Sequence, residues 1–204
     1  MRIGIIGAGN IGGTLGKAWS DRGHEVVFGV RDPHSPKTQK ALNETGGQVQ
    51  AVRFEDAAAF GEVLVLAVPW AAVRETVAAL GNVQGKIIID ATNRLTQTAE
   101  DAPSAAEDVQ KLAVGAKVVK AFNTMGWETL ANPIFNGTAA STFLCGDDAA
   151  AKGTVGKLAA ELGLQVVDCG PLTNAAAVES IARLWIYMMR NGSGRDMAFT
   201  LVRR

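Results

Sequence analysis

The sequence predicts an α/β protein whose Rossmann-type, doubly wound and mostly parallel sheet is followed by a C-terminal helical extension. Short runs rich in Val, Ile and Leu alternate with helix-favouring segments along most of the chain, which is the pattern of a parallel sheet with helices on both faces. The first run leads straight into the turn Gly7-Ala8-Gly9-Asn10-Ile11-Gly12, which opens a helix. A strand, a glycine turn and a helix in this order are typical of folds that bind a dinucleotide.

The order of the elements follows from the hydrophobic pattern. The apolar runs predict strands at 2–6, 25–30, 48–53, 62–68, 86–90, 117–122, 141–146 and 164–169. The intervening segments predict helices near 10–22, 37–45, 71–80, 104–113 and 148–162, with a longer apolar helix over roughly 174–190. Polar or Gly/Pro-broken segments at 93–104 and 123–140 are expected to be loops beyond strand ends, where ligands bind in open α/β sheets.

The length of 204 residues suits one domain with a modest appendage. The alternating pattern stops at Gly170-Pro171, so we expect an NADP-binding Rossmann domain over 1–170. We expect 171–204 to form a helix and tail that pack on the site, on a dimer partner, or on both. Because this helix is apolar around most of its surface, it must be buried on more than one side. Burial within the monomer and a homodimer interface both meet that need.

Charge and composition restrict the partners of the chain. The 20 basic residues equal the 20 acidic ones, and neither sign forms a long run, so neither nucleic acid nor an anionic membrane is an expected partner. The N-terminus shows no signal-peptide pattern and the apolar stretches fall short of the ~18 residues of a membrane span, so we expect a cytoplasmic protein with a small-molecule partner. Cys145 and Cys169 have no close histidine, which argues against a metal site and predicts buried apolar residues.

Each glycine of the first turn has a physical reason to be there. Gly7 allows the tight strand-to-helix turn, Gly9 lets the backbone approach a pyrophosphate, and Gly12 lets the helix pack closely on the strand. The N-terminus of the helix then directs free N–H groups and the positive end of its dipole at the phosphates. We therefore expect the cofactor pyrophosphate to bind at Gly7, Ala8, Gly9, Asn10, Ile11 and Gly12.

The end of the second predicted strand bears on the choice of cofactor. An acid there usually accepts hydrogen bonds from the ribose of NAD, whereas an arginine accommodates the extra phosphate of NADP. Asp32 lies 20 residues after Gly12, a spacing that also permits NAD. NADP is favoured because Asp32 already belongs to the turn, while Arg31 suits a doubly charged phosphate, with Lys37 as a second cation. The alternative is a surface ion pair between Arg31 and Asp32.

Side chains that could move a proton are scarce. The only tyrosine, Tyr187, is followed four residues later by Asn191, so the tyrosine–lysine pair of short-chain dehydrogenases is missing. Lys120 is the best remaining proton donor, although a structural role also explains a lysine at a strand end. An i,i+4 ion pair with Arg183 accounts for Glu179. Hydride transfer between two stacked rings needs positioning alone, so no catalytic residue is assigned.

Further motifs carry a family resemblance over nearly the whole chain. They are Gly23-His24-Glu25-Val26-Val27-Phe28-Gly29-Val30-Arg31, Val68-Pro69-Trp70, Ala91-Thr92-Asn93, Val119-Lys120-Ala121-Phe122-Asn123-Thr124, Cys145-Gly146-Asp147-Asp148 and Asp168-Cys169-Gly170-Pro171-Leu172. With the glycine turn, they make the chain resemble the NADPH-dependent reductases of coenzyme F-420, also written F420. The resemblance places the nicotinamide at Val68, Pro69, Trp70 and Asn93. It implies a deazaflavin over the nicotinamide, in a pocket formed by Asn123, Thr124, Met125 and the C-terminal segment.

Three functions are compatible with these residues. The first is an NADP(H)-dependent oxidoreductase that transfers hydride between NADPH and a deazaflavin or flavin-like acceptor. The second is an NADPH-dependent reductase of a small carbonyl or imine, in which Lys120 or a water gives the proton. The third is a non-catalytic NADP-binding sensor. We expect the first, because the scarcity of proton-moving residues matches direct ring-to-ring transfer.

Overall fold

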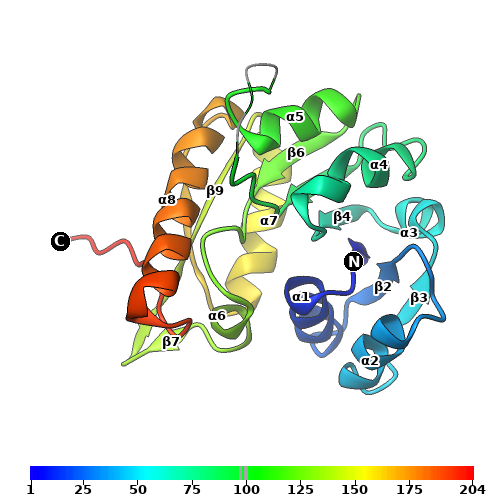
Figure 1. The fold of residues 1–204 in the computed structure, drawn as a ribbon, viewed down its shortest axis with the longest axis horizontal. Helices are drawn as coiled ribbons and strands as arrows, with labels where there is room; N and C mark the ends of the chain where they lie inside the picture. The colour runs from blue at the N-terminus through cyan, green and yellow to red at the C-terminus, as the bar shows by residue number, and fades with distance from the viewer. Residues whose placement is uncertain (97, 99–100) are drawn as a thin grey trace.

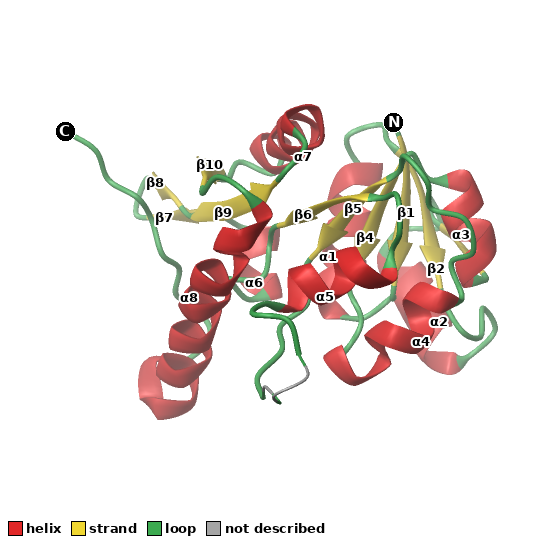
Figure 2. Ribbon diagram, turned by 90° about the horizontal axis from the view of Figure 1, so that it is seen from above, coloured by secondary structure: helices red, strands yellow, loops and turns green. Residues whose placement is uncertain are grey.

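The computed structural model describes residues 1–96, 98 and 101–204, and shows strands flanked by helices on both sides (Figures 1 and 2). The strands are β1 (Arg2–Ile6), β2 (Glu25–Gly29), β3 (Gln50–Val52), β4 (Val63–Leu66), β5 (Ile87–Asp90), β6 (Lys117–Lys120), β7 (Ile134–Phe135), β8 (Thr138–Ala139), β9 (Ser141–Gly146) and β10 (Gln165–Asp168). All but β7 and β8 form one sheet, in the order β10-β9-β6-β5-β4-β1-β2-β3. From β3 to β6 all neighbours are parallel, which is the Rossmann strand order, so the predicted fold class is confirmed.

The helices cover the two faces of this sheet. They are α1 (Asn10–Ser20), α2 (Pro36–Glu44), α3 (Phe54–Phe60), α4 (Val73–Ala78), α5 (Ala105–Leu112), α6 (Trp127–Ala131), α7 (Ala149–Glu161) and α8 (Ala175–Met188), with short turns η1 (Trp70–Ala72), η2 (Leu172–Asn174) and η3 (Met189–Ser193). Side-chain oxygens of Ser35, Ser104 and Asp148 accept backbone N–H groups at the starts of α2, α5 and α7. These caps fix where the helices begin.

Two hydrophobic clusters form the core, one on each face of the sheet. Because successive strand residues point to opposite faces, Ile5 packs in the cluster that contains Trp19 and Leu158, and Ile6 packs in the other. The first cluster joins α1 to α7, and the indole Nε1 of Trp19 also donates to the carbonyl oxygen of Leu158 at 3.1 Å. The central strands are therefore buried on both faces, which explains their continuous apolar sequences.

The reversal of β9 decides which segments reach the ligand-binding edge. The carboxyl edge is the edge of the sheet at which β1, β4, β5 and β6 end. Since β9 runs antiparallel to β6, with Lys120 opposite Cys145, the chain between them stays near this edge. Strand β10 is parallel to β9 and ends at the opposite edge, and α8 packs along β9 on its way back (Figure 1). The fold thus carries the far end of α8 to the carboxyl edge.

The expectation of a loop over 123–140 was wrong. This segment contains α6 and the hairpin of β7 and β8, joined by Asn136 and Gly137 at φ 50° and 81°. Asn-Gly is the preferred sequence for a two-residue turn of this kind, so the hairpin did have a sequence signal. Helix α3 was also missed because it is only 7 residues long. In the part of the chain that the structure describes, no helix combines the length and the apolar character of a membrane span.

Candidate active site

A cavity of about 620 Å³ lies at the carboxyl edge, on both sides of the point between β1 and β4 where the strand order reverses. Ligands bind at this switch point in open α/β sheets. Its lining comes from the glycine turn, the segments after β4, β5 and β6, and α8 with the tail behind it. The residues are Gly7, Ala8, Gly9, Asn10, Ile11, Lys37, Ala67, Val68, Pro69, Trp70, Ala91, Thr92, Asn93, Phe122, Asn123, Met125, Gly126, Trp127, Trp185, Ile186 and Arg195.

The glycine turn is shaped by close main-chain approach. Gly7 has φ 111°, and a Cβ atom there would lie 2.6 Å from the carbonyl oxygen of Ala67. A Cβ atom on Gly12 would lie 2.0 Å from the carbonyl oxygen of Gly7, so this glycine packs inside the turn and does not line the cavity. A Cβ atom on Gly9 would meet nothing within 4 Å. Since α1 also lacks a side-chain cap, its first N–H groups are free for an anion.

A second hollow of about 370 Å³ continues from the glycine turn past the end of β2. Arg31, Asp32, Ser35 and Lys37 line it, and Lys37 also lines the main cavity. The Asp32 carboxylate accepts the backbone N–H of His34 at 2.9 Å, so it stabilises the turn and does not pair with Arg31.

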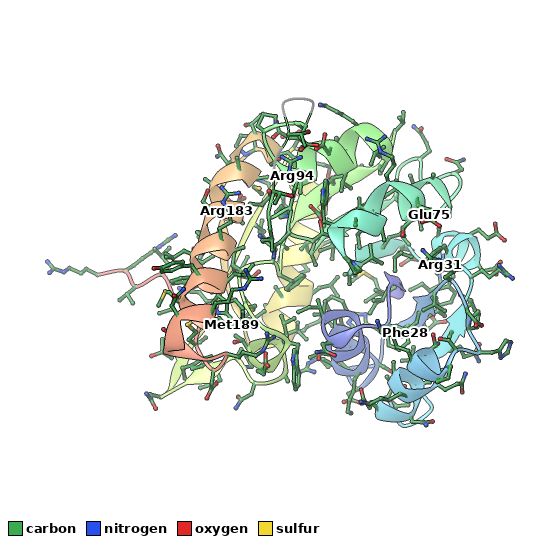
Figure 3. All side chains as sticks on the ribbon, viewed as in Figure 1. Phe28, Arg31, Glu75, Arg94, Arg183 and Met189 are labelled. Atoms are coloured by element: carbon green, nitrogen blue, oxygen red, sulfur yellow. The ribbon has the colours of Figure 1, made fainter. Side chains whose placement is uncertain are left out.

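Arg31 instead lies next to Glu75 of α4, at 3.4 Å between Nη2 and Oε2 (Figure 3). The ion pair between Arg31 and Asp32, considered as an alternative from the sequence, is not formed, and Arg31 pairs with Glu75 instead. Both side chains are more than two-thirds exposed, and an exposed ion pair contributes little stability. Arg31 can leave Glu75 for a phosphate at small cost.

An asparagine pair lies between the ends of β5 and β6. The side-chain N–H of Asn93 donates to the main-chain oxygen of Asn123 at 2.9 Å, and Asn123 Nδ2 donates to Asn93 Oδ1 at 3.1 Å. These bonds fix both amides, and they leave the buried Oδ1 of Asn123 without a donor among the described residues. A buried polar atom of this kind normally has a partner, so its position in the lining marks a place for a ligand donor.

Phe122, directly before this asparagine, has φ 62°. A bulky side chain in this left-handed region costs about 1–3 kcal/mol and persists only where the surroundings hold it. The ring packs edge-on against Trp19, with centroids 5.9 Å apart, and the Phe122 N–H donates to Thr142 Oγ1. The strained turn directs the chain from β6 to the cavity, where Phe122 and Asn123 line it. Thr124 is buried and does not line the cavity.

The far wall of the cavity is formed by α6, α8 and the tail. Trp127, Trp185, Ile186 and Arg195 all line it. The indole Nε1 of Trp185 donates to the carbonyl oxygen of Met197 at 3.0 Å, which fixes the ring against the tail. The resemblance had implied that the C-terminal segment forms part of the pocket, but it did not name Trp185, Ile186 or Arg195 as site residues, and Trp127 was not expected. The apolar character of the C-terminal helix does not specify which of its residues face a site.

Arg195 forms an ion pair with Glu128 of α6 and lies over the Trp185 ring, 5.6 Å from its centroid. Its Nη2 donates to Glu128 Oε2 at 3.2 Å, and its Nε donates to Oε1. Burial raises the pKa of the Glu128 carboxyl, but hydrogen bonding to Arg195, a backbone N–H and the charge of Arg195 together hold the pKa below its usual range. The same hydrogen bond raises the pKa of Arg195. Both groups are charged at neutral pH.

Beneath the wall, a closed cluster of buried charges corrects the expectation for Glu179. The Glu179 carboxylate does not pair with Arg183, whose guanidinium donates to Ser180 Oγ on the exposed side of α8 (Figure 3). It lies 3.1 Å from Lys120 Nζ and accepts the N–H groups of residues 105 and 106 at the start of α5. Lys120 Nζ also contacts Asp90 Oδ2 at 2.9 Å. Local spacing suggested the pair with Arg183, but the tertiary fold brings a buried ammonium closer.

Arg94 packs against Trp70, one of the residues that line the cavity. It is buried in the segment that was expected to be a loop, with its guanidinium 5.5 Å from the centroid of the Trp70 ring (Figure 3). It pairs with Asp108 of α5 and donates to the carbonyl oxygen of Ala102. This cation under the indole positions Trp70 at the cavity.

The cysteines and metal-binding residues can be placed as well. Cys145 is fully buried, and burial raises the pKa of its thiol to about 12. Cys169 is only partly buried, so the prediction of two buried cysteines was right for one of them. Within residues 1–96, 98 and 101–204, no group of three or more His, Cys, Asp or Glu side chains could hold a metal ion.

The structure brings together most of the sequence-predicted site residues. Those that line the main cavity are Gly7, Ala8, Gly9, Asn10, Ile11, Lys37, Val68, Pro69, Trp70, Asn93, Asn123 and Met125. Gly12 packs within the turn and Thr124 is buried behind the lining. Arg31 lines only the second hollow. This arrangement of a glycine turn and a cavity at the switch point of the sheet is that of a dinucleotide-binding protein of the Rossmann class.

Comparison with known proteins identifies the family. The profile of the family described as NADP oxidoreductase, coenzyme F420-dependent, matches residues 2–94. A solved structure from Arthrobacter sp. FB24, of a candidate F420-dependent NADP-reductase, is 32% identical, with a TM-score of 0.89 and full coverage of both chains. The chain belongs to the coenzyme F420-dependent NADP oxidoreductase family, and it is an NADP-dependent oxidoreductase.

Two characterised relatives show how the similarity is distributed. The F420-dependent NADP reductase of Methanothermobacter thermautotrophicus is 29% identical over 205 aligned positions, which cover 91% of this chain and 88% of that one. Metalloreductase STEAP3 of Rattus norvegicus is 30% identical over 182 positions, which cover 88% of this chain. The matched region is only 36% of the metalloreductase, so the chain spans about a third of that relative's length.

Proposed function

We propose that the protein transfers hydride between NADPH and a planar acceptor, a deazaflavin such as coenzyme F420 or a flavin. In this proposal the glycine turn from Gly7 to Gly12 binds the pyrophosphate, and Arg31 with Lys37 binds the phosphate on the adenosine. The nicotinamide lies against Val68, Pro69, Trp70 and Asn93, and the acceptor lies between it and the far wall. When bound, the nicotinamide supplies the hydride, while the protein binds and orients both rings.

The chemistry of the cavity lining carries this proposal. The lining presents the indoles of Trp70, Trp127 and Trp185, and its charged side chains are Lys37 and Arg195. None of the described lining residues is a His, Asp, Glu, Cys or Tyr. Flat indole surfaces are suited to ring-shaped ligands. Direct transfer between two stacked rings needs orientation and exclusion of water, which such a lining supplies.

Asn123 supports the placement of the nicotinamide. Its buried Oδ1 lacks a donor among the described residues, and the carboxamide of a nicotinamide carries an N–H donor. We therefore propose that Asn123 accepts this N–H and sets the rotation of the ring. The two hydrogen bonds between Asn93 and Asn123 would hold this acceptor in a fixed position between the ends of β5 and β6.

Lys120 argues against reduction of a small carbonyl or imine with this residue as the proton donor. Its side chain is fully buried, and its Nζ donates to Asp90 and to the carbonyl oxygen of Thr92, and lies 3.1 Å from Glu179. Lys120 is not part of the cavity lining. Two hydrogen bonds and two carboxylates hold this ammonium, so Lys120 serves the structure around the site.

We also propose the two parts expected from the sequence: residues 1–170 bind NADP, and residues 171–204 complete the far wall, against which the acceptor lies. The same C-terminal part offers a surface for a homodimer, because Leu184 and Tyr187 on α8 are 50% and 65% exposed. Large apolar side chains grouped on one helix face are typical of contact surfaces. Light scattering at micromolar concentration tests the dimer, and a clean monomer mass would contradict it.

Acceptor-dependent oxidation of NADPH tests the proposed reaction. The substitution Trp185→Ala removes part of the far wall and is expected to lower kcat/KM for the acceptor about tenfold, with little change in NADPH affinity. The matched control is Arg183→Ala, on the exposed side of the same helix and outside the described cavity lining. If neither the deazaflavin nor any flavin oxidises NADPH in the presence of the wild-type protein, the proposed reaction is wrong.

A further inference from the structure

The two cations of the cavity have different neighbours. Lys37 lies at the glycine-turn end, where it also lines the hollow next to Arg31, so the phosphates of the dinucleotide account for it. Arg195 lies at the far wall with Trp127 and Trp185. The nicotinamide position proposed above, at Trp70 and Asn93, does not use it. A cation in the lining of the acceptor end therefore needs an explanation of its own.

The guanidinium of Arg195 is already arranged to bind an anion. Its Nε and Nη2 face the two carboxylate oxygens of Glu128, which is the two-point geometry that arginine uses for carboxylates and phosphates. The third side, Nη1, contacts Met189 Sδ at 3.4 Å, a weak partner. Trp185 lies against the face of the same guanidinium. The site thus combines a fork of N–H donors with an aromatic plane.

The backbone around Arg195 allows the side chain to change partner. It follows Gly192 and Gly194, at φ 101° and 70°, where helical geometry ends. Two hydrogen bonds hold the tail beyond Arg195. The carbonyl oxygen of Met197 accepts the Trp185 Nε1–H, and that of Phe199 accepts the N–H of Ser141. The Arg195 side chain is 47% exposed and that of Glu128 is 27% exposed. A partly exposed pair can exchange one anion for another at little cost.

We infer that Arg195 selects an acceptor that carries a carboxylate or phosphate beside its ring, and that Glu128 holds the guanidinium in place until this anion displaces it. The inference rests on the proposed function and names the class of acceptor. The ring lies against Trp127 and Trp185, and the anionic group takes the position of the Glu128 carboxylate. Arg195 is then a specificity-determining residue, and the Glu128 carboxylate competes with the acceptor's anionic group for the Arg195 guanidinium.

A pair of flavins that share one ring tests the inference. Riboflavin is uncharged, whereas FMN carries a phosphate on the same ring system. Dissociation constants come from quenching of tryptophan fluorescence in the presence of NADP, and kcat/KM values come from NADPH oxidation. The wild-type protein is expected to favour FMN about tenfold or more in both measurements. Added salt reduces this preference, because the contact is electrostatic and partly exposed.

Two substitutions change the preference in opposite directions. Arg195→Met is expected to bring the FMN-to-riboflavin ratio close to one, and Glu128→Gln is expected to raise the ratio above the wild-type value. The control is Arg190→Met, which removes an exposed arginine of the same segment outside the described cavity lining and leaves the ratio unchanged. Since both flavins are measured on one preparation, partial unfolding of a variant does not affect the ratio.

The outcomes separate this inference from the proposed reaction. Equal binding of FMN and riboflavin by the wild type, or an unchanged ratio in Arg195→Met, overturns the role of Arg195 even if NADPH is oxidised. A binding preference that Arg195→Met abolishes, without turnover of any acceptor, supports the anion site and contradicts the hydride transfer. Preference in both binding and turnover supports both.

Discussion

At the glycine-turn end the cavity is bounded mostly by one short segment, residues 7–11, with Lys37 beside it, whereas the far wall consists of residues from α6, α8 and the tail. The turn owes its shape to hydrogen atoms in place of Cβ atoms, as at Gly7 and Gly12. The far wall owes its shape to hydrogen bonds and ion pairs between distant residues, such as Arg195 with Glu128. In the proposed function, the first end binds a cofactor that is common to many enzymes, whereas the far wall can be altered by single side-chain changes.

The buried charges of Lys120, Asp90 and Glu179 connect the segment after β5 with α8. Lys120 holds the segment after β5 through the carbonyl oxygen of Thr92, and it holds α8 through Glu179. The segment after β5 lines the cavity near the proposed nicotinamide, and α8 carries Trp185. One buried ammonium thus helps to fix α8 relative to the segment after β5.

Loss of the Lys120 ammonium should have the largest effect on the stability of the site. We expect Lys120→Met to lower the free energy of unfolding by about 3–5 kcal/mol, because it leaves the carboxylates of Asp90 and Glu179 buried without their cation. Urea unfolding measures this change. The control Lys17→Met removes an exposed i,i+4 pair with Asp21 and is expected to cost less than about 1 kcal/mol. Similar losses in the two variants would contradict the role of the cluster.

A methyl group in the glycine turn should impair dinucleotide binding and also cost some stability. We expect Gly12→Ala to weaken NADPH binding at least about a hundredfold and to destabilise the fold by about 1–3 kcal/mol, because its Cβ would lie 2.0 Å from the Gly7 oxygen. Gly13→Ala is the matched control, since a Cβ there meets nothing within 4 Å and alanine favours the helix. Titration of NADPH and thermal unfolding measure both effects. Normal NADPH affinity in Gly12→Ala would show that the turn does not hold the pyrophosphate.

Loss of Arg31, which follows β2, should distinguish NADPH from NADH at the glycine-turn end. Arg31→Ala is expected to weaken NADPH binding about tenfold and to leave NADH binding nearly unchanged, since only NADPH carries the extra phosphate. Glu75→Gln releases Arg31 from its ion pair and should not weaken NADPH binding. An Arg31→Ala variant with full NADPH affinity would remove Arg31 from the phosphate site.

The smallest expected effect concerns Cys145, next to the charge cluster. Burial raises the pKa of its thiol from 9.0 to about 12, so the folded protein keeps a proton that the unfolded chain loses above about pH 9. The free energy of unfolding therefore decreases as pH rises from about 9 to 12, by up to about 1.4 kcal/mol per pH unit. Cys145→Ala should flatten this slope in urea unfolding between pH 9 and 10. An unchanged slope would show that the thiol does not contribute.

The same contrast explains how much the sequence could predict. The glycine turn could be recognised because its requirements lie within one local segment, and the central strands could be placed because they are buried on both faces. The hairpin at Asn136-Gly137 also had a local signal, although it was overlooked. These features depend on neighbours in the chain.

The far wall depended on information that is not local. The position of Trp185 follows from the reversal of β9, which sends α8 back to the carboxyl edge. The partner of Glu179 follows from the same reversal, because α8 then lies near Lys120, whereas spacing along the helix pointed to Arg183. Sequence spacing can propose a pair, but only the topology decides between competing charges.

Helix α8 has a consequence for insertions and deletions. Glu179 is tied to Lys120 and to the start of α5, and Trp185 is tied to the carbonyl oxygen of Met197. The six residues from one to the other rise about 9 Å along the helix, and each added residue rotates the rest of the helix by about 100°. A single insertion between them would rotate the indole off the cavity with every side chain still present. Substitutions in this interval can remodel the far wall, whereas a change in its length removes it.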